Sequence, residues 1–313
     1  MSKTSGLGDD LLVGGYHIGS DTQQLSLHGG PALIDVTDIT QSAHSRLGGL
    51  RDGGMEMTVY HDPAPGMAHD ALKGLPTADT IATYLRSPVL GAPAACCNGK
   101  QIGYDPTRSN SGELTIKTQI DSDGYGLEWG VQLTPGVRTD TAATNGPAVD
   151  GAGGLVTPAV PASGTPVTNS SPLPVQVVVT GGTVTNVAVN GATAGTGDGT
   201  YTLPAAGSIT LTYSAAPTWT WTAQTGFGAQ AYLQAAALTG TSATVTVQHS
   251  PDGSSWSTLL AFTAVTAAPT AQRLDTANTT TVGRYVRAIT TGTFTSFAFA
   301  VVFVRNPIAG VTF

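Results

Sequence analysis

The sequence of 313 residues is poor in charged side chains, which make up 11% of it, against about a quarter in a typical soluble domain. Acidic residues outnumber basic ones, 20 against 13, and the formal net charge is −7. Lysines and arginines nowhere form a run. The composition therefore argues against tight binding to nucleic-acid phosphates, which requires clustered positive charge.

Long apolar runs are also missing. The chain has no stretch of 18 or more apolar residues, so we expect no membrane-spanning helix. Residues 1–10 lack the apolar segment of a signal peptide. We expect the protein to stay in the compartment where it is made, or to leave it only as part of a larger assembly.

Cysteine is nearly absent, and the two that occur, Cys96 and Cys97, are neighbours. A disulfide between neighbours requires a strained ring, and one such pair forms neither a disulfide framework nor a metal site. We expect two small, half-buried thiols in a reducing compartment.

The sequence also lacks motifs for catalysis. Its six histidines have no zinc-site spacing, and neither a nucleophile elbow nor a phosphate loop occurs. His61-Asp62 and His69-Asp70 could be drawn as a metal cluster, but a loop rich in proline and glycine explains them better. The turn at residues 121–124 lacks the later ligands of a calcium loop. We expect no enzyme activity, no cofactor and no metal.

What the sequence does contain is 40 glycines and many short runs of β-branched and aromatic residues, which favour strands separated by turns. We predict strands at 11–18, 33–39, 55–61, 114–120, 126–133, 231–238, 243–249, 284–290 and 297–305. One helix is predicted from residue 77, with Ile81, Tyr84 and Leu85 on one face, ending before Pro88. Residues 40–54 are predicted as a long exposed loop.

The composition changes sharply after residue 150. Between residues 151 and 223 the single charged residue is Asp198, and a linker rich in proline, glycine, serine and threonine covers 157–166. Four strand-like runs follow at 175–180, 184–189, 199–203 and 209–213, with a hairpin signal at Asn190-Gly191. This spacing predicts a small immunoglobulin-like β-sandwich. A last strand closes it, in which Trp219 and Trp221 point the same way, either into the core or onto a ligand platform.

The predicted fold class is therefore mostly β: an antiparallel β-sandwich or barrel with one short helix, plus an immunoglobulin-like β-sandwich domain. We expect the first part of the larger domain at residues 1–152, the linker and smaller domain at 153–223, and the second part of the larger domain at 224–313.

Three stretches of the larger domain carry a resemblance. They are Asp35 to Asp62, which contains Arg46-Leu-Gly-Gly-Leu-Arg-Asp-Gly-Gly-Met; Glu128 to Asp140; and Gln230 to Arg287, which contains Tyr232-Leu-Gln and Arg284-Tyr-Val-Arg. In these stretches the chain resembles the major tail tube proteins of long-tailed, siphovirus-type phages of actinobacteria. In that family the second stretch runs on to the third after a short spacer. The resemblance therefore implies that the smaller domain is inserted into the tail tube domain.

The resemblance implies a structural virion protein, assembled in the host cytoplasm and located in the phage tail. Its subunits would form stacked, hexameric rings around a lumen through which DNA passes without sticking, which suits an acidic protein. Its partners would be copies of itself and other tail proteins: the tape measure, terminator and distal tail proteins. The inserted domain would project outward, where weak contact with host-surface glycans is a further expectation.

For assembly we predict the loop at 40–54 and the strand that follows it. Arg46 and Arg51 are candidate donors of ion pairs between rings, although both could equally be solvated. The full set of candidate assembly residues is Arg46, Leu47, Leu50, Arg51, Met55, Met57 and Val59.

Two other function classes remain open from the residues. One is a capsid decoration or minor tail protein, which would form trimers or isolated caps. The other is a glycan-binding β-sandwich adhesin, whose candidate surface aromatics are Trp219, Trp221 and Trp256.

Overall fold

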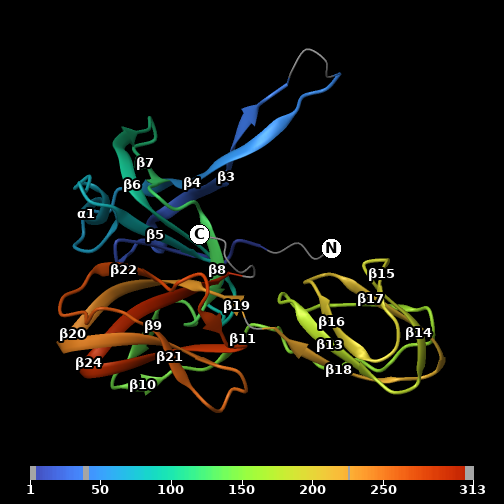
Figure 1. Cartoon of the computed structure of the whole chain (residues 1–313). Helices are drawn as coiled ribbons and strands as arrows, with labels where there is room; N and C mark the ends of the chain where they lie inside the picture. The colour runs from blue at the N-terminus through green and yellow to red at the C-terminus, as the bar shows by residue number, and fades with distance from the viewer. Residues whose placement is uncertain (1–4, 38–41, 225, 307–313) are drawn as a thin grey trace.

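The computed structural model of the chain describes residues 5–37, 42–224 and 226–306. Within these residues the strands pair antiparallel, and the single α-helix is α1 (Ala68–Leu72). The expected fold class, mostly β with antiparallel sheets and one short helix, is therefore confirmed. Figure 1 shows a larger body, a long ribbon that projects from it, and a smaller β-sandwich to one side.

Seven strands form the N-terminal sheet, in the order β3–β4–β7–β6–β5–β1–β2. Their bounds are β1 (Asp10–Val13), β2 (Tyr16–His17), β3 (Thr22–Asp35), β4 (Arg46–Tyr60), β5 (Thr80–Leu85), β6 (Pro93–Arg108) and β7 (Leu114–Ser122), and a 3₁₀ turn, η1 (Gly19–Asp21), precedes β3. The outer strand β3 pairs with β4 alone among the described strands. Its other edge is therefore open, a feature through which sheets can associate.

The predicted loop at 40–54 is confirmed at residues 42–45 and is wrong from Arg46 onward. Residues 38–41 lie outside the described part, but β4 already begins at Arg46, which lies opposite Asp35 of β3. Glycine-rich segments have low intrinsic strand preference. The pairing with β3 supplies the strand that the sequence pattern did not predict.

The helix is also not where the sequence predicted it. Residues 80–85 form strand β5, which pairs with β1 and β6. Helix α1 lies instead after β4, in the segment rich in proline and glycine that was predicted as a loop around His61 and His69. Residues distant in sequence form hydrogen bonds with both of its ends. The N–H of Ala68 donates to the carboxylate of Asp21 at 3.0 Å, and the side-chain amide of Gln101 donates to the carbonyl of Leu72 at 2.7 Å. Five helical residues give no periodicity to recognise, so tertiary contacts decide this element.

Two long strands organise the C-terminal sheet: β20 (Ala229–Ser250) and β24 (Tyr285–Arg305), which pair along their length. The sequence predicted each as two shorter strands, because residues around Gly240 and Gly292 indicated turns. In β20 the ladder instead passes Gly240 through register shifts, the signature of a β-bulge.

Shorter strands line the edges of this long pair. They are β9 (Arg138–Asp140), β10 (Thr144–Asn145) and β11 (Val149–Asp150) on β24, and β21 (Ser257–Ala261) and β22 (Thr270–Asp275) on β20. Strand β8 (Glu128–Gln132) pairs with both β6 and β24 and so joins the two sheets. A separate pair, β19 (Gly226–Phe227) and β23 (Thr281–Val282), lies near the end of β24.

The two sheets of the body share a core. Along β1 the buried side chains alternate: Leu11 and Val13 join the cluster beneath helix α1, whereas Leu12 joins a second cluster with Tyr232 and Val302 of the C-terminal sheet. Successive strand residues point to opposite faces, so β1, β5 and β6 form a middle layer that is covered on both sides. Residues before the smaller sandwich and residues after it therefore fold as one body.

The smaller sandwich consists of two sheets with the orders β12–β17–β14–β15 and β16–β13–β18. The strands are β12 (Pro166–Thr168), β13 (Val175–Thr180), β14 (Thr183–Val189), β15 (Ala192–Gly195), β16 (Gly199–Leu203), β17 (Ser208–Ala215) and β18 (Thr218–Ala223). All four strands predicted between 175 and 213 are confirmed. The hairpin at Asn190-Gly191 is also confirmed, with both residues at positive φ.

The order of the strands departs from the immunoglobulin arrangement at the first and last strand. Strand β13 pairs with β16, and β14 pairs with β17, as strands B, E, C and F do in that arrangement. However, the first strand, β12, lies beside β17, and the last, β18, lies beside β13. The outer two strands have therefore exchanged places.

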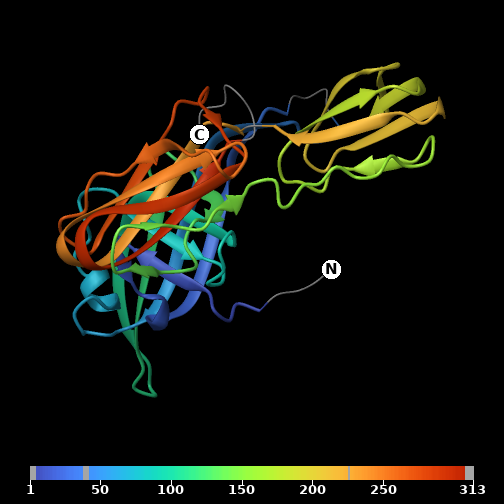
Figure 2. The same ribbon diagram turned by 90° about the horizontal axis from the view of Figure 1, so that it is seen from below.

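The chain enters and leaves this sandwich side by side, as Figure 2 shows. The hydroxyl oxygen of Thr157 accepts a hydrogen bond from the backbone N–H of Trp221 at 3.0 Å, and the carbonyl of Pro158 accepts one from the indole N–H of Trp219 at 2.8 Å. The incoming segment thus runs alongside the last strand.

Candidate functional site

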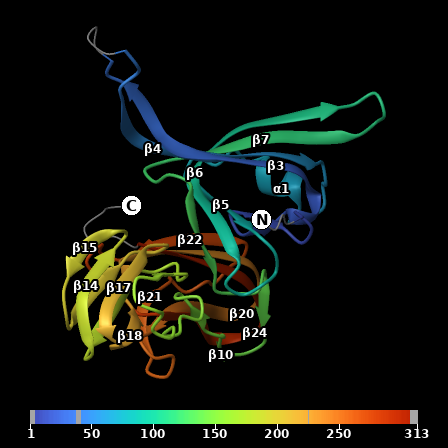
Figure 3. The same ribbon diagram turned by 90° about the vertical axis from the view of Figure 1, so that its right-hand side faces the viewer.

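The projecting part of the β3–β4 ribbon, called the arm below, comprises residues 28–35 of β3 and 46–53 of β4. From Tyr60 back to Gly54, strand β4 is flanked by both β3 and β7, but beyond Gly54 it pairs with β3 alone. Figure 3 shows the ribbon extending clear of the sheet. A two-stranded ribbon is marginally stable in water by itself. A covering surface would therefore stabilise the arm.

The arm exposes large apolar side chains. Leu50 is 88% exposed and Leu47 is 57% exposed, and the neighbouring side chains of Arg46 and Arg51 are exposed as well. Protein interfaces combine apolar anchors with arginine more often than ordinary surface does. The four residues that the sequence nominated in this segment thus stay together on one projecting element.

Glycines at the base of the arm permit a close approach of the chain. A Cβ atom at Gly53 would lie 2.6 Å from the backbone nitrogen of Leu127, and one at Gly54 would lie 2.7 Å from the carbonyl oxygen of Ile120. Both contacts are too short for any side chain. The cluster Asp52-Gly53-Gly54, predicted as part of a loop, is therefore a strand segment that Leu127 and Ile120 approach closely.

The other three nominated residues are not available for assembly. Met55 and Val59 are fully buried, Met57 is 1% exposed, and all three belong to the core cluster that includes Leu72 of α1. The prediction that they contact other subunits is wrong, because their side chains fill the subunit's own core. Apolar and polar residues alternate in this strand because its apolar side chains face the subunit's own core.

A groove of about 690 Å³ lies beside the first half of β3. It runs between that strand and the strands β1 and β5, and its lining combines apolar side chains with a few polar ones. Trp129 is the most exposed large apolar side chain of the lining, at 53%. Residues of the lining include Asp9, Asp10, Leu25, Leu27, Tyr84, Arg86, Pro93 and Trp129.

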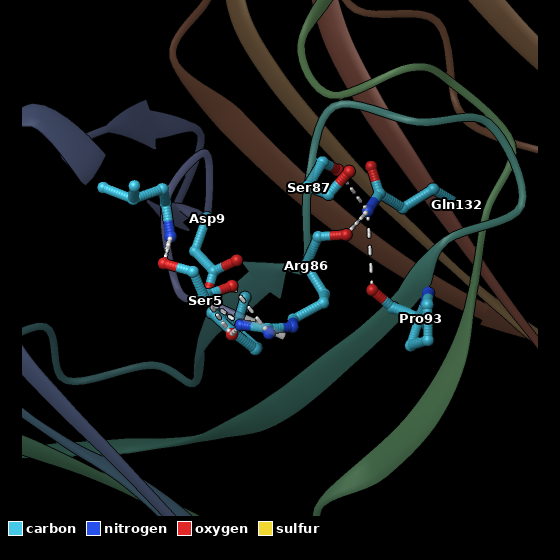
Figure 4. A network of polar contacts seen from close by, with 8 residues as sticks. Ser5, Asp9, Arg86, Ser87, Pro93 and Gln132 are labelled. Atoms are coloured by element: carbon cyan, nitrogen blue, oxygen red, sulfur yellow. Dashed lines mark hydrogen bonds and ion pairs between the residues drawn. The ribbon is translucent and has the colours of Figure 1, made fainter. Parts of the chain in front are cut away.

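One wall of this groove is fixed by a polar network, which Figure 4 shows. Arg86 donates to the carboxylate of Asp9 at 2.6 Å and to the carbonyl of Ser5 at 2.8 Å, and the Tyr84 hydroxyl also donates to Asp9. Hydrogen bonding to Tyr84 and Asp9 raises the pKa of Arg86, while burial and the bond to Asp9 raise the pKa of Tyr84. The amide of Gln132 donates to the carbonyl of Ser87 at 2.9 Å. The groove is thus a preformed surface.

A buried polar cluster joins the two sheets of the body. Tyr232 of β20, fully buried, donates its hydroxyl to Glu128 of β8, and Arg273 of β22 donates to the tyrosine oxygen at 2.9 Å. The guanidinium also stacks on Tyr125, with its central carbon 3.5 Å from the ring centroid. Burial, followed by the charge of Glu128, raises the pKa of Tyr232 far above its usual range. For Arg273, burial works to lower the pKa, and Tyr232 and Glu128 outweigh it.

Gln234 makes a second link between the sheets. Its side-chain amide donates to the carbonyl of Ile81 and to the hydroxyl of Thr83, both at 2.9 Å, while its oxygen accepts from the N–H of Gly15 at 2.6 Å. Glu128, Tyr232, Gln234 and Arg273 all belong to the stretches that carry the resemblance. Their positions in the fold show that they are structural connections between distant strands.

The three tryptophans nominated as ligand aromatics differ in position. Trp219 and Trp221 are 7% and 6% exposed, and their rings meet edge to face, 5.4 Å apart, within the core of the smaller sandwich. A surface platform at these two residues is therefore wrong. Trp256 is half-buried, and the guanidinium carbon of Arg287 lies 4.1 Å from its ring centroid. Gln248 accepts two hydrogen bonds from that guanidinium.

The histidines do not gather into a metal site. His61 and His69 lie close, with ring centroids 4.6 Å apart, but His69 bonds to the hydroxyl of Tyr104. Over residues 5–37, 42–224 and 226–306, no group of three or more potential metal ligands occurs. The same residues contain no helix long and apolar enough to span a membrane.

No family model matches the chain, and no curated protein matches it. Among solved structures, the crystal structure of the Dit protein of phage SPP1, described as a paradigm of the hub adsorption apparatus in phages that infect Gram-positive bacteria, aligns with 95% of this chain and 98% of its own at 10% identity and a TM-score of 0.26. The phage p2 baseplate in its activated conformation with Sr aligns with 96% and 99% at 9% identity, also with a TM-score of 0.26. Backbone agreement at this level carries no argument, so the chain's own residues must support a function.

Proposed function

We propose that the protein is a structural subunit of a phage tail that assembles with copies of itself into stacked, hexameric rings of a tail tube, through which DNA passes. The observation that carries the proposal is the arm. It projects from the body as a two-stranded ribbon and exposes Leu47 and Leu50 beside two arginines. A monomer gains nothing from such an element, whereas an assembly gains a long contact between subunits.

The open edge of β3 supports the same proposal. This strand has 14 residues and pairs on one side only among the described strands. Long open edges promote uncontrolled pairing unless they are covered. Addition of a neighbouring subunit's strand covers the edge and continues the sheet from subunit to subunit around a ring.

The resemblance to tail tube proteins lies in stretches that the fold joins. Glu128 comes from the second stretch, Tyr232 and Arg273 from the third, and all three meet in one buried cluster. Such a cluster fixes the body as a rigid unit, which suits a ring subunit. The net charge of −7 suits a lumen along which DNA slides.

We propose further that residues 153–223 are an immunoglobulin-like domain inserted in the tube domain and directed outward. Arg284, the residue just before β24, supports the junction: it pairs with Asp150 at 2.8 Å and donates to the carbonyl of Leu155. The sandwich has its own core, and the chain enters and leaves it side by side. Weak contact with host-surface glycans is a role open to such a domain.

Negative-stain electron microscopy of the concentrated protein tests the proposal. Rings or tubes with a central hole are the expected result, and class averages then give the symmetry. Compact particles without a hole at any concentration would overturn it. Those particles would favour a capsid decoration protein or an adhesin, for which glycan binding at Trp256 is the next assay.

A further inference from the structure

The arm and the groove lie on the same subunit but cannot meet within it. From β3 the groove is lined by Thr22, Gln23, Leu25 and Leu27, at the base of the ribbon. Leu50 lies five residues beyond Met55, the partner of Leu27, and therefore roughly 16 Å farther along the strand at about 3.3 Å per residue. Because β3 and β4 are paired over this length, the ribbon cannot fold back. The exposed leucines can enter a groove of this kind only on another molecule.

The two surfaces complement each other in chemistry. The arm presents Leu47 and Leu50 between Arg46 and Arg51, and all four side chains are exposed. The groove presents Leu25, Leu27, Pro93 and the half-exposed ring of Trp129 as its apolar part.

Charge matches as well. The groove contains two carboxylates, Asp9 and Asp10, against one arginine, Arg86, which Asp9 already pairs. The second carboxylate, Asp10, is paired by His17, whose charge is conditional on pH. With His17 neutral, an incoming arginine meets a surface with one uncompensated carboxylate.

We infer that the groove between β3 and the strands β1 and β5 is the receptor for the arm of a second copy of this chain. The occupant's Leu50 and Leu47 contact Trp129 and Leu25, and its arginines approach Asp9 and Asp10. Since the two surfaces differ, the contact is heterologous: each subunit gives an arm and receives one. Such contacts close into rings or extend as filaments. This inference rests on the proposed function and adds the receiving surface.

Photo-crosslinking locates the occupant directly. Benzoylphenylalanine replaces Leu50 in one sample, and in a matched control it replaces Val156, which is 76% exposed and lies outside both surfaces. Each variant is mixed as normal and ¹⁵N-labelled protein, so that hybrid peptides identify contacts between copies. We expect position 50 to crosslink to peptides that contain residues 9–11, 22–27, 84–93 or 129 of another copy. Position 156 should give none of these products.

Other outcomes separate the two claims. Rings whose position 50 crosslinks to a different surface, or tip to tip with another arm, would overturn the receptor and leave the proposed function intact. Failure to assemble under any condition would count against both. As a second measurement, Trp129→Ala should raise the protein concentration required for assembly about tenfold, as expected for an aromatic anchor. An unchanged requirement in a folded Trp129→Ala variant would contradict the groove.

Discussion

Arg273 donates from its Nε to the hydroxyl oxygen of Tyr232 at 2.9 Å; the Tyr232 side chain is fully buried and that of Arg273 is 7% exposed. Strand β22 supplies the first residue and strand β20 the second, while their shared partner, Glu128, comes from β8. Because β8 pairs with both sheets, this cluster holds the body at the point where its halves meet.

We expect Tyr232→Phe to lower the free energy of unfolding of the body by about 1–3 kcal/mol, because it removes a buried hydroxyl that two charged groups use. Urea denaturation followed by circular dichroism measures the change. The matched control is Tyr201→Phe in the smaller sandwich, whose hydroxyl donates to the carbonyl of Gly197 at 3.3 Å and should matter less. Equal losses of unfolding free energy in the two variants would show that the buried cluster contributes no more to stability than an ordinary hydrogen bond.

The leucines of the arm should matter for assembly and not for folding. Leu47→Asp with Leu50→Asp changes two exposed side chains, so the free energy of unfolding should move by less than about 0.5 kcal/mol per site. Rings should disappear in negative-stain images, since charged groups would then face an apolar contact. Val156→Asp serves as the control, because the 76% exposure of Val156 lies between the values for Leu47 and Leu50. Normal tubes from the double variant would refute a role for the arm.

The smaller sandwich should be removable. Replacing residues 157–223 by a short Gly/Ser linker leaves β11 and β19 in place, and Asp150 still pairs with Arg284. We expect a folded body that still assembles, measured by circular dichroism and electron microscopy. Loss of all folding in this deletion would place the segment in the core of the body.

The two cysteines should be inert while the protein is folded. Both are fully buried, on opposite faces of β6, and not half-buried as the sequence predicted. Burial raises the pKa of Cys97 to about 12 and that of Cys96 well above its usual value. A thiol reagent should modify neither in native protein and both in urea. Fast modification of the native protein would show that the middle layer opens.

His17 should make stability depend on pH. Its hydrogen bond to Asp10, at 2.6 Å, raises its pKa above 6.5 against the opposing effect of burial. The stabilisation is complete below the unfolded pKa and is lost as pH rises through the folded pKa. The stability gap between wild type and His17→Gln should therefore be larger at about pH 5.5 than at about pH 8.5.

His249 gives the opposite sign and serves as the control for His17. Burial lowers its pKa, so its neutral form is favoured in the fold and stability is lost as pH falls. The gap between wild type and His249→Gln should shrink or reverse at low pH. Urea unfolding at the two pH values measures both gaps, and the same trend for both histidines would contradict the assignment.

The sequence predicted best those elements that follow one physical signal. Met55, Met57 and Val59 alternate with polar residues and form a half-buried strand, and residues 175–213 contain strands and turns in regular order. It predicted worst where two signals compete. Ile81, Tyr84 and Leu85 satisfy a helical period and also a strand, and pairing with β1 and β6 decides for the strand.

Of the two surfaces of the candidate site, the sequence predicted residues of the arm but not the groove. Arg46 and Leu50 lie close in the chain, so their shared element could be nominated, although as a loop. The groove joins Asp9, Tyr84 and Trp129, which come from three distant segments. No local sequence pattern connects these three residues. The one indication of a site is Trp129, an aromatic residue in a predicted strand, but the sequence does not show on which face of the strand its side chain lies.

The neighbouring points at which the chain enters and leaves the smaller sandwich have a practical consequence. Thr157 and Trp221 are joined by a hydrogen bond. The whole sandwich therefore spans only a short distance between β11 and β19 of the body. Any compact domain whose two ends lie equally close could occupy the same position. An assembled tube would then display that cargo once per subunit, at the spacing that the rings impose.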